Sequence, residues 1–192
     1  RPKMVFARNT GVCMEDSYPE GARLLHLGSG DIHWDGWVNV DQHVGEWNPM
    51  HTTPKGKPDV IADITHLPDA DETADAICAV HVIEHFYQWE VQNVLAEWRR
   101  VLKPGGKLIL ELPSMEKVFR YIANAMDRKL PMSGTFSTLP IWGDPKYRNV
   151  AMCHKWGWMF STMSIELVKA GFTNIKGLKP RYHFVERDMR VE

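Results

Sequence analysis

The chain has 192 residues, of which 44% are hydrophobic and 24% are charged, and its formal net charge is −1. This composition is typical of a globular protein, and the length fits one domain with a sizeable core. The balanced charge argues against a large basic surface for nucleic acid. The three cysteines lie far apart without a Cys-x-x-Cys pair, which predicts a reducing, cytoplasmic location. No apolar run is long enough to span a membrane, so no membrane partner is expected.

Two apolar segments near the N-terminus each end in residues suited to nucleotide binding. Residues 24–27 lead into Gly28–Gly30, and residues 37–40 lead into Asp41. In an α/β sheet, ligands bind beyond the carboxyl ends of neighbouring strands. Glycine lets the backbone approach a ligand closely, and a carboxylate can accept two hydrogen bonds from a ribose diol. The alternative interpretation is a tight turn followed by a solvated aspartate.

The connection between these two segments is short. Six residues separate Gly30 from Trp37, whereas a parallel crossover usually needs about a dozen. Asp35-Gly36 between apolar stretches is also a hairpin signal. Either the crossover is reduced and the strands are parallel, or the second strand is antiparallel. We favour the short crossover because the later segments require an α/β sheet.

The middle of the chain alternates between strand and helix patterns. Residues 1–22 have no clear period and are expected to form an N-terminal arm, and residues 42–58 form a loop. Residues 90–102 have their apolar positions on one helical face, and the Lys-Pro-Gly-Gly sequence that follows ends the helix. Strands are expected at 59–62, 76–80 and 107–112. This order predicts a mostly parallel sheet.

The last third of the chain contains a long irregular stretch. Helices are expected at 116–126, with Ser114 as the cap, and from 161 or 162 to 170. A long irregular stretch inside a compact domain is usually functional. We therefore expect residues 114–160 to form an insertion, or lid, on the substrate side. The final strands are expected at 173–176 and 182–186.

These motifs resemble the class I S-adenosylmethionine-dependent methyltransferases, especially the small members of methyltransferase type 11. The resemblance covers the chain from about Leu24 to the C-terminus. It rests on four matches, which are Leu27–Gly30, Asn39–Asp41, Ala62–Ile64 with Leu67-Pro68 and Asp75–Ile77, and Val82–His85 continuing into Glu97–Leu108. The resemblance implies one methyltransferase domain over 1–192 with a Rossmann-like α/β fold. Such a fold has a mostly parallel sheet, helices on both faces, an antiparallel C-terminal strand and, in close relatives, a short first crossover.

The resemblance also implies S-adenosyl-L-methionine as the cofactor and S-adenosyl-L-homocysteine as the product. Asp41 would hold the ribose, Asp63 and Ile64 the adenine, and His81 would face the methyl-donor region. The implied cofactor-binding residues are Leu27, Gly28, Ser29, Gly30, Asp41, Gln42, Asp63, Ile64 and His81. The chain departs from the family at His26, where an acid is usual, and at Ile32, where a third glycine is usual.

Two histidines, His81 and His154, are the candidates for catalysis, since an imidazole suits the deprotonation of a hydroxyl. The alternative for His154 is a hydrogen-bonded histidine in the lid. No metal is expected. Glu84 and His85, which share a possible helical face with His81, are the candidates if a metal is used. Otherwise Glu84 and His85 cap the following helix.

The sequence thus predicts S-adenosylmethionine-dependent methyl transfer to a small-molecule acceptor, by O- or N-methylation, with a saccharide or another metabolite as the substrate. The first alternative is a non-catalytic module that binds S-adenosylmethionine or a nucleotide. The second is an NAD-dependent oxidoreductase, which would normally carry Gly-x-Gly-x-x-Gly before a long helix. The sequence does not predict the oligomeric state.

Overall fold

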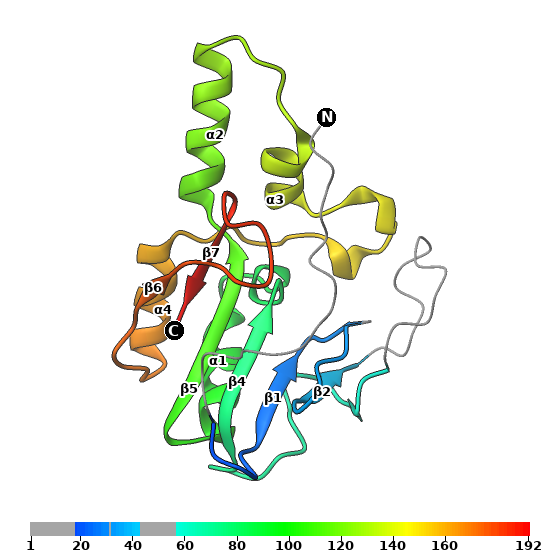
Figure 1. Cartoon of the computed structure of the whole chain (residues 1–192), viewed down its shortest axis with the longest axis vertical. Coiled ribbons are helices and arrows are strands. Elements are labelled where there is room, and N and C mark those ends of the chain that lie inside the picture. The colour runs from blue at the N-terminus through cyan, green and yellow to red at the C-terminus, as the bar shows by residue number, and fades with distance from the viewer. Residues whose placement is uncertain (1–17, 31, 43–56) are drawn as a thin grey trace.

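A seven-stranded sheet with the order β3-β2-β1-β4-β5-β7-β6 forms the centre of the computed structural model (Figure 1). The structure describes residues 18–30, 32–42 and 57–192. Strands β1 to β5 are parallel, β7 is antiparallel to β5, and β6 is antiparallel to β7. The strands are β1 (Leu24–Leu27), β2 (Val38–Asp41), β3 (Val60–Ile61), β4 (Ala74–Val80), β5 (Leu102–Pro113), β6 (Gly177–Leu178) and β7 (Asp188–Val191). The predicted mostly parallel sheet with an antiparallel C-terminal strand is confirmed.

The short crossover between β1 and β2 is also confirmed, because Leu25 pairs with Val38 in parallel register. The buried side chain of Asn39 holds this connection together. Its amide group donates to the carbonyls of Trp34 and Trp37, and its oxygen accepts from the Trp34 amide. One side chain therefore satisfies three backbone groups of a loop that is too short for a helix.

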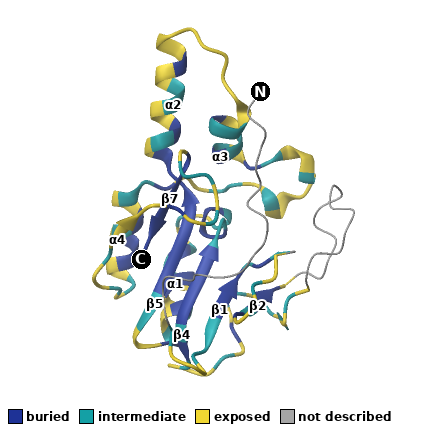
Figure 2. Ribbon diagram, in the orientation of Figure 1, coloured by how far each residue is buried: buried dark blue, intermediate teal, exposed yellow. Residues whose placement is uncertain are grey.

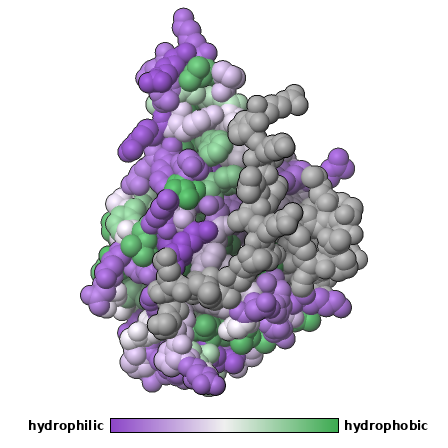
Figure 3. All heavy atoms as spheres, in the orientation of Figure 1, coloured by the Kyte–Doolittle hydropathy of each residue, from purple (hydrophilic) through white to green (hydrophobic). Residues whose placement is uncertain are grey.

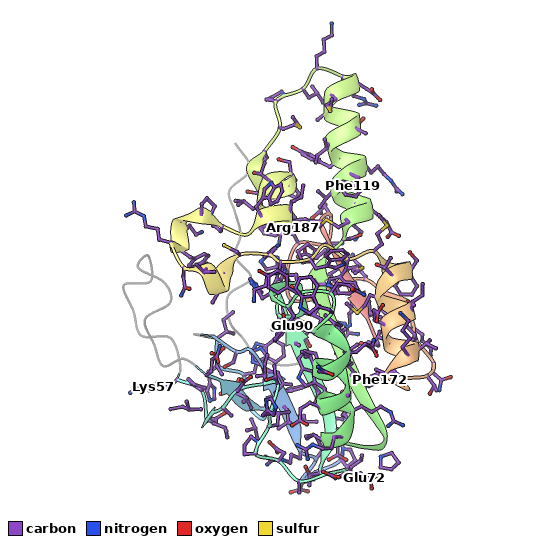
Figure 4. The ribbon with its side chains drawn as sticks, turned by 180° about the vertical axis from the view of Figure 1, so that it is seen from behind. Lys57, Glu72, Glu90, Phe119, Phe172 and Arg187 are labelled. Carbon is purple, nitrogen blue, oxygen red and sulfur yellow. The ribbon has the colours of Figure 1, made fainter. Side chains whose placement is uncertain are left out.

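Helices α1 (Val91–Val101) and α4 (Phe160–Lys169) lie against one face of the sheet, behind it in Figure 1 and in front of it in Figure 4. The predicted apolar face of α1 is buried, and its Trp98 is fully inaccessible to solvent. The indole Nε1 of Trp98 donates to the carbonyl of Ile64 at 2.9 Å. This bond fixes the loop after β3 to the helix layer.

Aromatic side chains cover the opposite face, on which the described residues form no helix. The buried residues of this face include Trp37, Cys78 and Ile109, and Trp34 and Tyr182 pack against them. The expected helices on this second face are thus not found in the described part of the chain. The short β1–β2 connection explains the difference, since it leaves no room for a helix there.

Beyond β5, the chain leaves the sheet and builds the predicted insertion. Helix α2 (Met115–Asp127) begins at Ser114, whose side chain accepts from the Lys117 amide, so the predicted cap is confirmed. The short helix α3 (Thr138–Trp142) and the 3-10 turns Gly134–Phe136, Pro145–Tyr147 and Val150–Met152 follow. These elements extend past the carboxyl ends of the parallel strands (Figure 1), and most of them are exposed, whereas the strands are buried (Figure 2).

The two final strands were predicted at the wrong positions. Strands occur at 177–178 and 188–191 rather than at 173–176 and 182–186. Residues 184–188 form a turn instead, in which the Phe184 carbonyl accepts from the amides of Arg187 and Asp188. The Asp188 carboxylate in turn accepts from the Phe184 amide. The predicted strand at 182–186 is therefore replaced by this turn.

The N-terminal arm up to residue 17 and residues 43–56 of the predicted loop lie outside the described residues. In the part that is described, hydrophobic residues are scattered among hydrophilic ones over the face shown in Figure 3. None of the helices described has the length and apolar character needed to cross a bilayer.

Candidate active site

The glycine loop after β1 has the backbone that its sequence predicts. Gly28 and Gly30 have φ angles of 65° and 57°, in the left-handed region that favours glycine. A Cβ on Gly28 would lie 2.5 Å from a methyl carbon of Val82, whereas a Cβ on Gly30 would meet none of the described residues within 4 Å. The loop thus packs closely on one side and faces open space on the other.

Asp41 lies beside this loop at the end of β2. Its Oδ2 accepts from the Gly30 amide at 2.8 Å, so the carboxylate and the glycine loop are joined directly. Asp41 is buried, whereas its neighbour Gln42 is exposed. The structure therefore brings together the residues predicted from the first two strand ends.

Asp63 and Ile64, the residues expected near the adenine, lie in the loop after β3. The Oδ1 atom of Asp63 accepts from the amide and from the hydroxyl of Thr65, both at 2.8 Å. The backbone hydrogen bond from Thr65 lowers the pKa of the Asp63 carboxyl. This side chain therefore shapes its own loop and remains an ionised acceptor.

These features fit S-adenosylmethionine. Among the described residues, no side chain lies within 4 Å of a Cβ position on Gly30, which gives an amino-acid moiety room to approach the backbone. A carboxylate at the adjacent strand end suits a ribose diol. The departure at His26 has a structural basis, because this histidine is buried, contacts Asn39 and stacks on Trp34. Burial lowers the pKa of His26 to about 4, so it carries no charge at neutral pH.

His81, the first residue after β4, sits between two carboxylates. Its φ angle of 55° is uncommon for a non-glycine residue and turns the chain sharply at the sheet edge. Its Nδ1 lies 2.8 Å from Glu84 Oε1, and its Nε2 lies 3.0 Å from Asp188 Oδ2. Both ring nitrogens therefore face a buried acid.

The charges of this cluster decide the protonation of His81. Burial opposes the imidazolium form, but Glu84 and Asp188 outweigh it and raise the pKa of His81 to about 9. Burial also opposes ionisation of Glu84, yet the nearby His81 lowers the pKa of Glu84 to about 2. The pKa of Asp188 lies far below its usual range because burial is outweighed by His183, His81 and Arg187. At neutral pH, His81 therefore carries two ring protons and both acids are ionised.

Asp188, the first residue of β7, contacts both His81 after β4 and His183 in the loop that precedes β7. Its carboxylate is fully buried, and its Oδ1 accepts from Arg187 Nε at 2.7 Å. Its Oδ2 lies 2.7 Å from His183 Nδ1 as well as facing His81. Arg187 also donates to the Thr135 carbonyl of the insertion, and Figure 4 shows Arg187 beside the insertion.

The insertion is fixed to the site through Glu84. The Glu84 carbonyl accepts from the amides of Lys155 and Trp156. His154 Nε2 lies 3.9 Å from Glu84 Oε1, and its Nδ1 lies 2.8 Å from the Pro140 carbonyl. The structure thus brings the two predicted catalytic histidines to the same oxygen of one carboxylate, Glu84 Oε1.

The two candidate metal ligands do not form a set together. His85 Nδ1 faces the Cys153 carbonyl at 3.2 Å. Glu84, His81 and His154 have ligand atoms close enough together to hold an ion. His85 is not a member of this group. That no metal is used stays a prediction.

Sequence reasoning missed three site residues, namely His183, Arg187 and Asp188. They lie about a hundred positions after His81, in a stretch that was assigned to strand and loop. One signal in the sequence could have indicated them. Arg187 and Asp188 are two adjacent charged residues at the start of the last strand, and the fold buries this strand.

The comparisons with known proteins agree with this geometry. A family model described as a methyltransferase domain, of type 11, matches residues 41–110. This range includes Asp41, the loop after β3, the His81 turn and the helix that precedes β5. No curated protein sequence matches the chain.

Solved structures share the fold over most of the chain. An S-adenosylmethionine-dependent methyltransferase from Archaeoglobus fulgidus has 16% identity and a TM-score of 0.55, over 89% of this chain and 85% of that chain. Human N-acetylserotonin methyltransferase, solved with S-adenosylmethionine, has 13% identity and a TM-score of 0.52, over 88% and 46%. Haemonchus contortus phosphoethanolamine N-methyltransferase 2, also solved with S-adenosylmethionine, has 15% identity and a TM-score of 0.50, over 85% and 36%. The chain thus spans less than half the length of the last two proteins.

The fold and the family match together define the class of protein. Residues 41–110 match a methyltransferase domain of type 11, and the chain has the fold of a class I S-adenosylmethionine-dependent methyltransferase. The acceptor is not determined by these findings.

Proposed function

We propose that this methyltransferase transfers a methyl group to a small-molecule acceptor by O- or N-methylation. S-adenosylmethionine supplies an electrophilic methyl group on a sulfonium, so catalysis depends mainly on alignment. We assign the binding of its methionine moiety to Leu27–Gly30 and of its ribose to Asp41 with Gln42. Asp63 and Ile64 are assigned to the adenine, and His81 lies beside the methyl group.

The acceptor is assigned to the side of the site that residues 114–160 cover. The hollow between α3 and the following turns has a volume of about 360 Å³ and is lined by Trp142, Arg148 and Cys153 among others. Ligand pockets for small molecules typically begin near this size. An aromatic ring with polar neighbours suits a saccharide or a similar metabolite. The whole chain, 1–192, acts as one domain in this proposal.

We assign positioning roles to the two predicted catalytic histidines. His81 is protonated and paired on both nitrogens, so it places a positive charge between two acids instead of accepting a proton. His154 has its Nε2 turned toward Glu84 and only 10% of its side chain exposed. It therefore helps to hold residues 154–156 of the insertion against Glu84.

The observation that carries the proposal is the direct bond between the Gly30 amide and the Asp41 carboxylate, which builds one binding surface from two strand ends. The test is the melting temperature with S-adenosylmethionine, S-adenosylhomocysteine or NAD(H). A ligand that binds only the folded protein raises the melting temperature. We expect a shift with the first two ligands alone. A shift with NAD(H) alone, or no shift with any of them, would contradict the proposal.

A further inference from the structure

We propose that the hollow in the insertion binds an anionic group of the acceptor, a carboxylate or a phosphate, and that Arg148 recognises this group. The inference rests on the proposed function, because it requires a small-molecule acceptor on this side of the site. It deepens that function by naming the chemical class of the acceptor, an oxyanion attached to a flat body, and one residue that determines the specificity.

The hollow is part of a loop whose two ends are joined. Gly143 and Cys153 form an antiparallel bridge, so residues 144–152 leave the insertion and return to it at one point. Gly143 has a φ angle of 84°, and a Cβ at this position would collide with the carbonyl oxygen of Met152. Glycine is therefore required where the loop closes.

Two side chains fix the path of the chain inside this loop. Asp144 accepts from the amide of Lys146 at 3.0 Å, and Asn149 accepts from the amide of Ala151 at 2.9 Å. Each of these bonds caps a 3-10 turn. Arg148 lies between the two turns in the left-handed conformation, with φ 49° and ψ 32°. The loop thus holds the backbone of Arg148 at a defined place in the lining of the hollow.

The charges of the lining favour an anion. Of the described residues that line the hollow, two carry a charge, Asp144 and Arg148. The Oδ2 atom of Asp144 lies 2.7 Å from Lys146 Nζ, so this carboxylate is neutralised. Arg148 is exposed, and within the described part of the chain its guanidinium has no ion pair and no hydrogen bond. A guanidinium offers a planar fork of donors that matches the two oxygens of a carboxylate or phosphate.

Trp142 gives the hollow a flat wall. Tryptophan is highly buried on average, whereas 68% of Trp142 is exposed. Its indole lines the same hollow as Arg148 and presents an apolar face to a ligand. A ligand that carries its anionic group on a ring therefore uses both side chains at once. The volume of about 360 Å³ leaves room for one such small molecule.

The wall of the hollow continues into the active site. Cys153 lines the hollow, and the next residue, His154, donates its amide to the Trp142 carbonyl at 3.3 Å. His154 Nε2 lies 3.9 Å from Glu84 Oε1, and the same oxygen lies 2.8 Å from His81 Nδ1. An acceptor with its oxyanion in the hollow is thus directed along this wall toward the strand end that we assign to the methyl group.

The first test uses the parent protein with S-adenosylhomocysteine bound. Phenylglyoxal modifies accessible guanidinium groups, and peptide mass spectrometry locates each modified arginine. We expect Arg148 to react and the buried Arg190 to be protected. At twice its dissociation constant, 4-hydroxybenzoate should slow the reaction at Arg148 about threefold, because about a third of the sites remain free. Its neutral isostere 4-hydroxybenzamide should give no protection, and the exposed Arg128 should react alike in all samples.

The second test measures the affinity of matched probes by calorimetry. The charged probes are 4-hydroxybenzoate, glucuronate and glucose 6-phosphate, and the neutral ones are 4-hydroxybenzamide and glucose. Arg148→Gln should weaken the binding of the charged probes by about tenfold and leave the neutral ones unchanged. Arg128→Gln, at an exposed arginine of α2 outside the hollow, should match the parent. Trp142→Ala should instead weaken both members of each pair.

The form of the anion follows from the same measurements. Tighter binding of glucuronate than of glucose 6-phosphate would identify a carboxylate, and the reverse order would identify a phosphate. In both cases, raising the ionic strength should weaken the charged probes alone, since the charge on Arg148 is exposed to solvent.

The outcomes separate the inference from the proposed function. If the parent binds neither S-adenosylmethionine nor S-adenosylhomocysteine, the proposed function fails. If the parent binds them but takes up no charged probe, or binds charged and neutral probes equally, the function stands and the role of Arg148 is refuted. Equal loss of both kinds of probe in Arg148→Gln refutes it as well. If Arg148→Gln does not fold, Arg148→Gly takes its place, because glycine adopts a φ angle of 49° without strain.

Discussion

Raising the pH should destabilise this protein through one residue, His81. Its pKa rises from an ordinary 6.5 to about 9 on folding, because Glu84 and Asp188 flank a ring that is only 20% exposed. The folded state therefore holds the proton more tightly than the unfolded state. The resulting stabilisation is fully present below pH 6.5 and is lost as the pH rises to 9. The difference between these pKa values corresponds to about 3 kcal/mol, a large share of the about 5–15 kcal/mol of a typical domain.

The measurement is urea unfolding between pH 6.5 and pH 10 for the parent, for His81→Gln and for His33→Gln. At pH 6.5 we expect His81→Gln to be less stable than the parent by about 3 kcal/mol, because it leaves buried carboxylates without their cation. This gap should close toward pH 9.5, whereas His33→Gln should follow the parent. The lowered pKa values of His85 and His183 act below pH 6.5, outside this window. A gap between parent and His81→Gln that does not change with pH would refute the reasoning.

Three further predictions concern the cofactor side and the core. Asp41→Asn should weaken S-adenosylhomocysteine binding by about 2 kcal/mol, or about 30-fold in calorimetry, because a charged acceptor is lost; unchanged affinity would remove Asp41 from the ribose site. Gly28→Ala should lower the free energy of unfolding more than Gly36→Ala and should abolish the binding of S-adenosylhomocysteine. Both glycines have a positive φ angle, but of the two only Gly28 lacks space for a Cβ. Equal losses of stability in urea unfolding would contradict this prediction. Arg190→Met should destabilise the fold by about 3 kcal/mol, because it leaves the buried Glu111 without its ion pair; adding Glu111→Gln should restore part of the loss.

The cofactor half of the site could be predicted because each of its parts is local in the sequence. The glycine loop and Asp41 follow directly after apolar strands, and the fold brings parallel strand ends together whatever the details of packing. The same holds for α1, whose apolar spacing and Lys-Pro-Gly-Gly end are visible without tertiary information. The short crossover was predictable for a related reason, since only a parallel second strand fits the later βαβ order.

The acceptor half depends on contacts that the sequence does not show. Asp188 reaches His81 across the antiparallel end of the sheet, and no local pattern links the two positions. Residues 182–186 were predicted as a strand, but hydrogen bonds between Phe184 and Asp188 make a turn there. Here tertiary contacts outweigh the local pattern.

The histidines of this chain show why residue type alone could not assign the chemistry. Burial outweighs the effect of Asp41 on His26 and lowers its pKa to about 4, so it packs as a neutral ring. His81 is partly buried but lies between two acids, and its pKa rises to about 9. His183 shares Asp188 with His81, and the positive charge on His81 is one of the causes that lower the pKa of His183. The protonation of one histidine therefore contributes to lowering the pKa of the next, so the charge of each ring depends on its neighbours rather than on residue type alone.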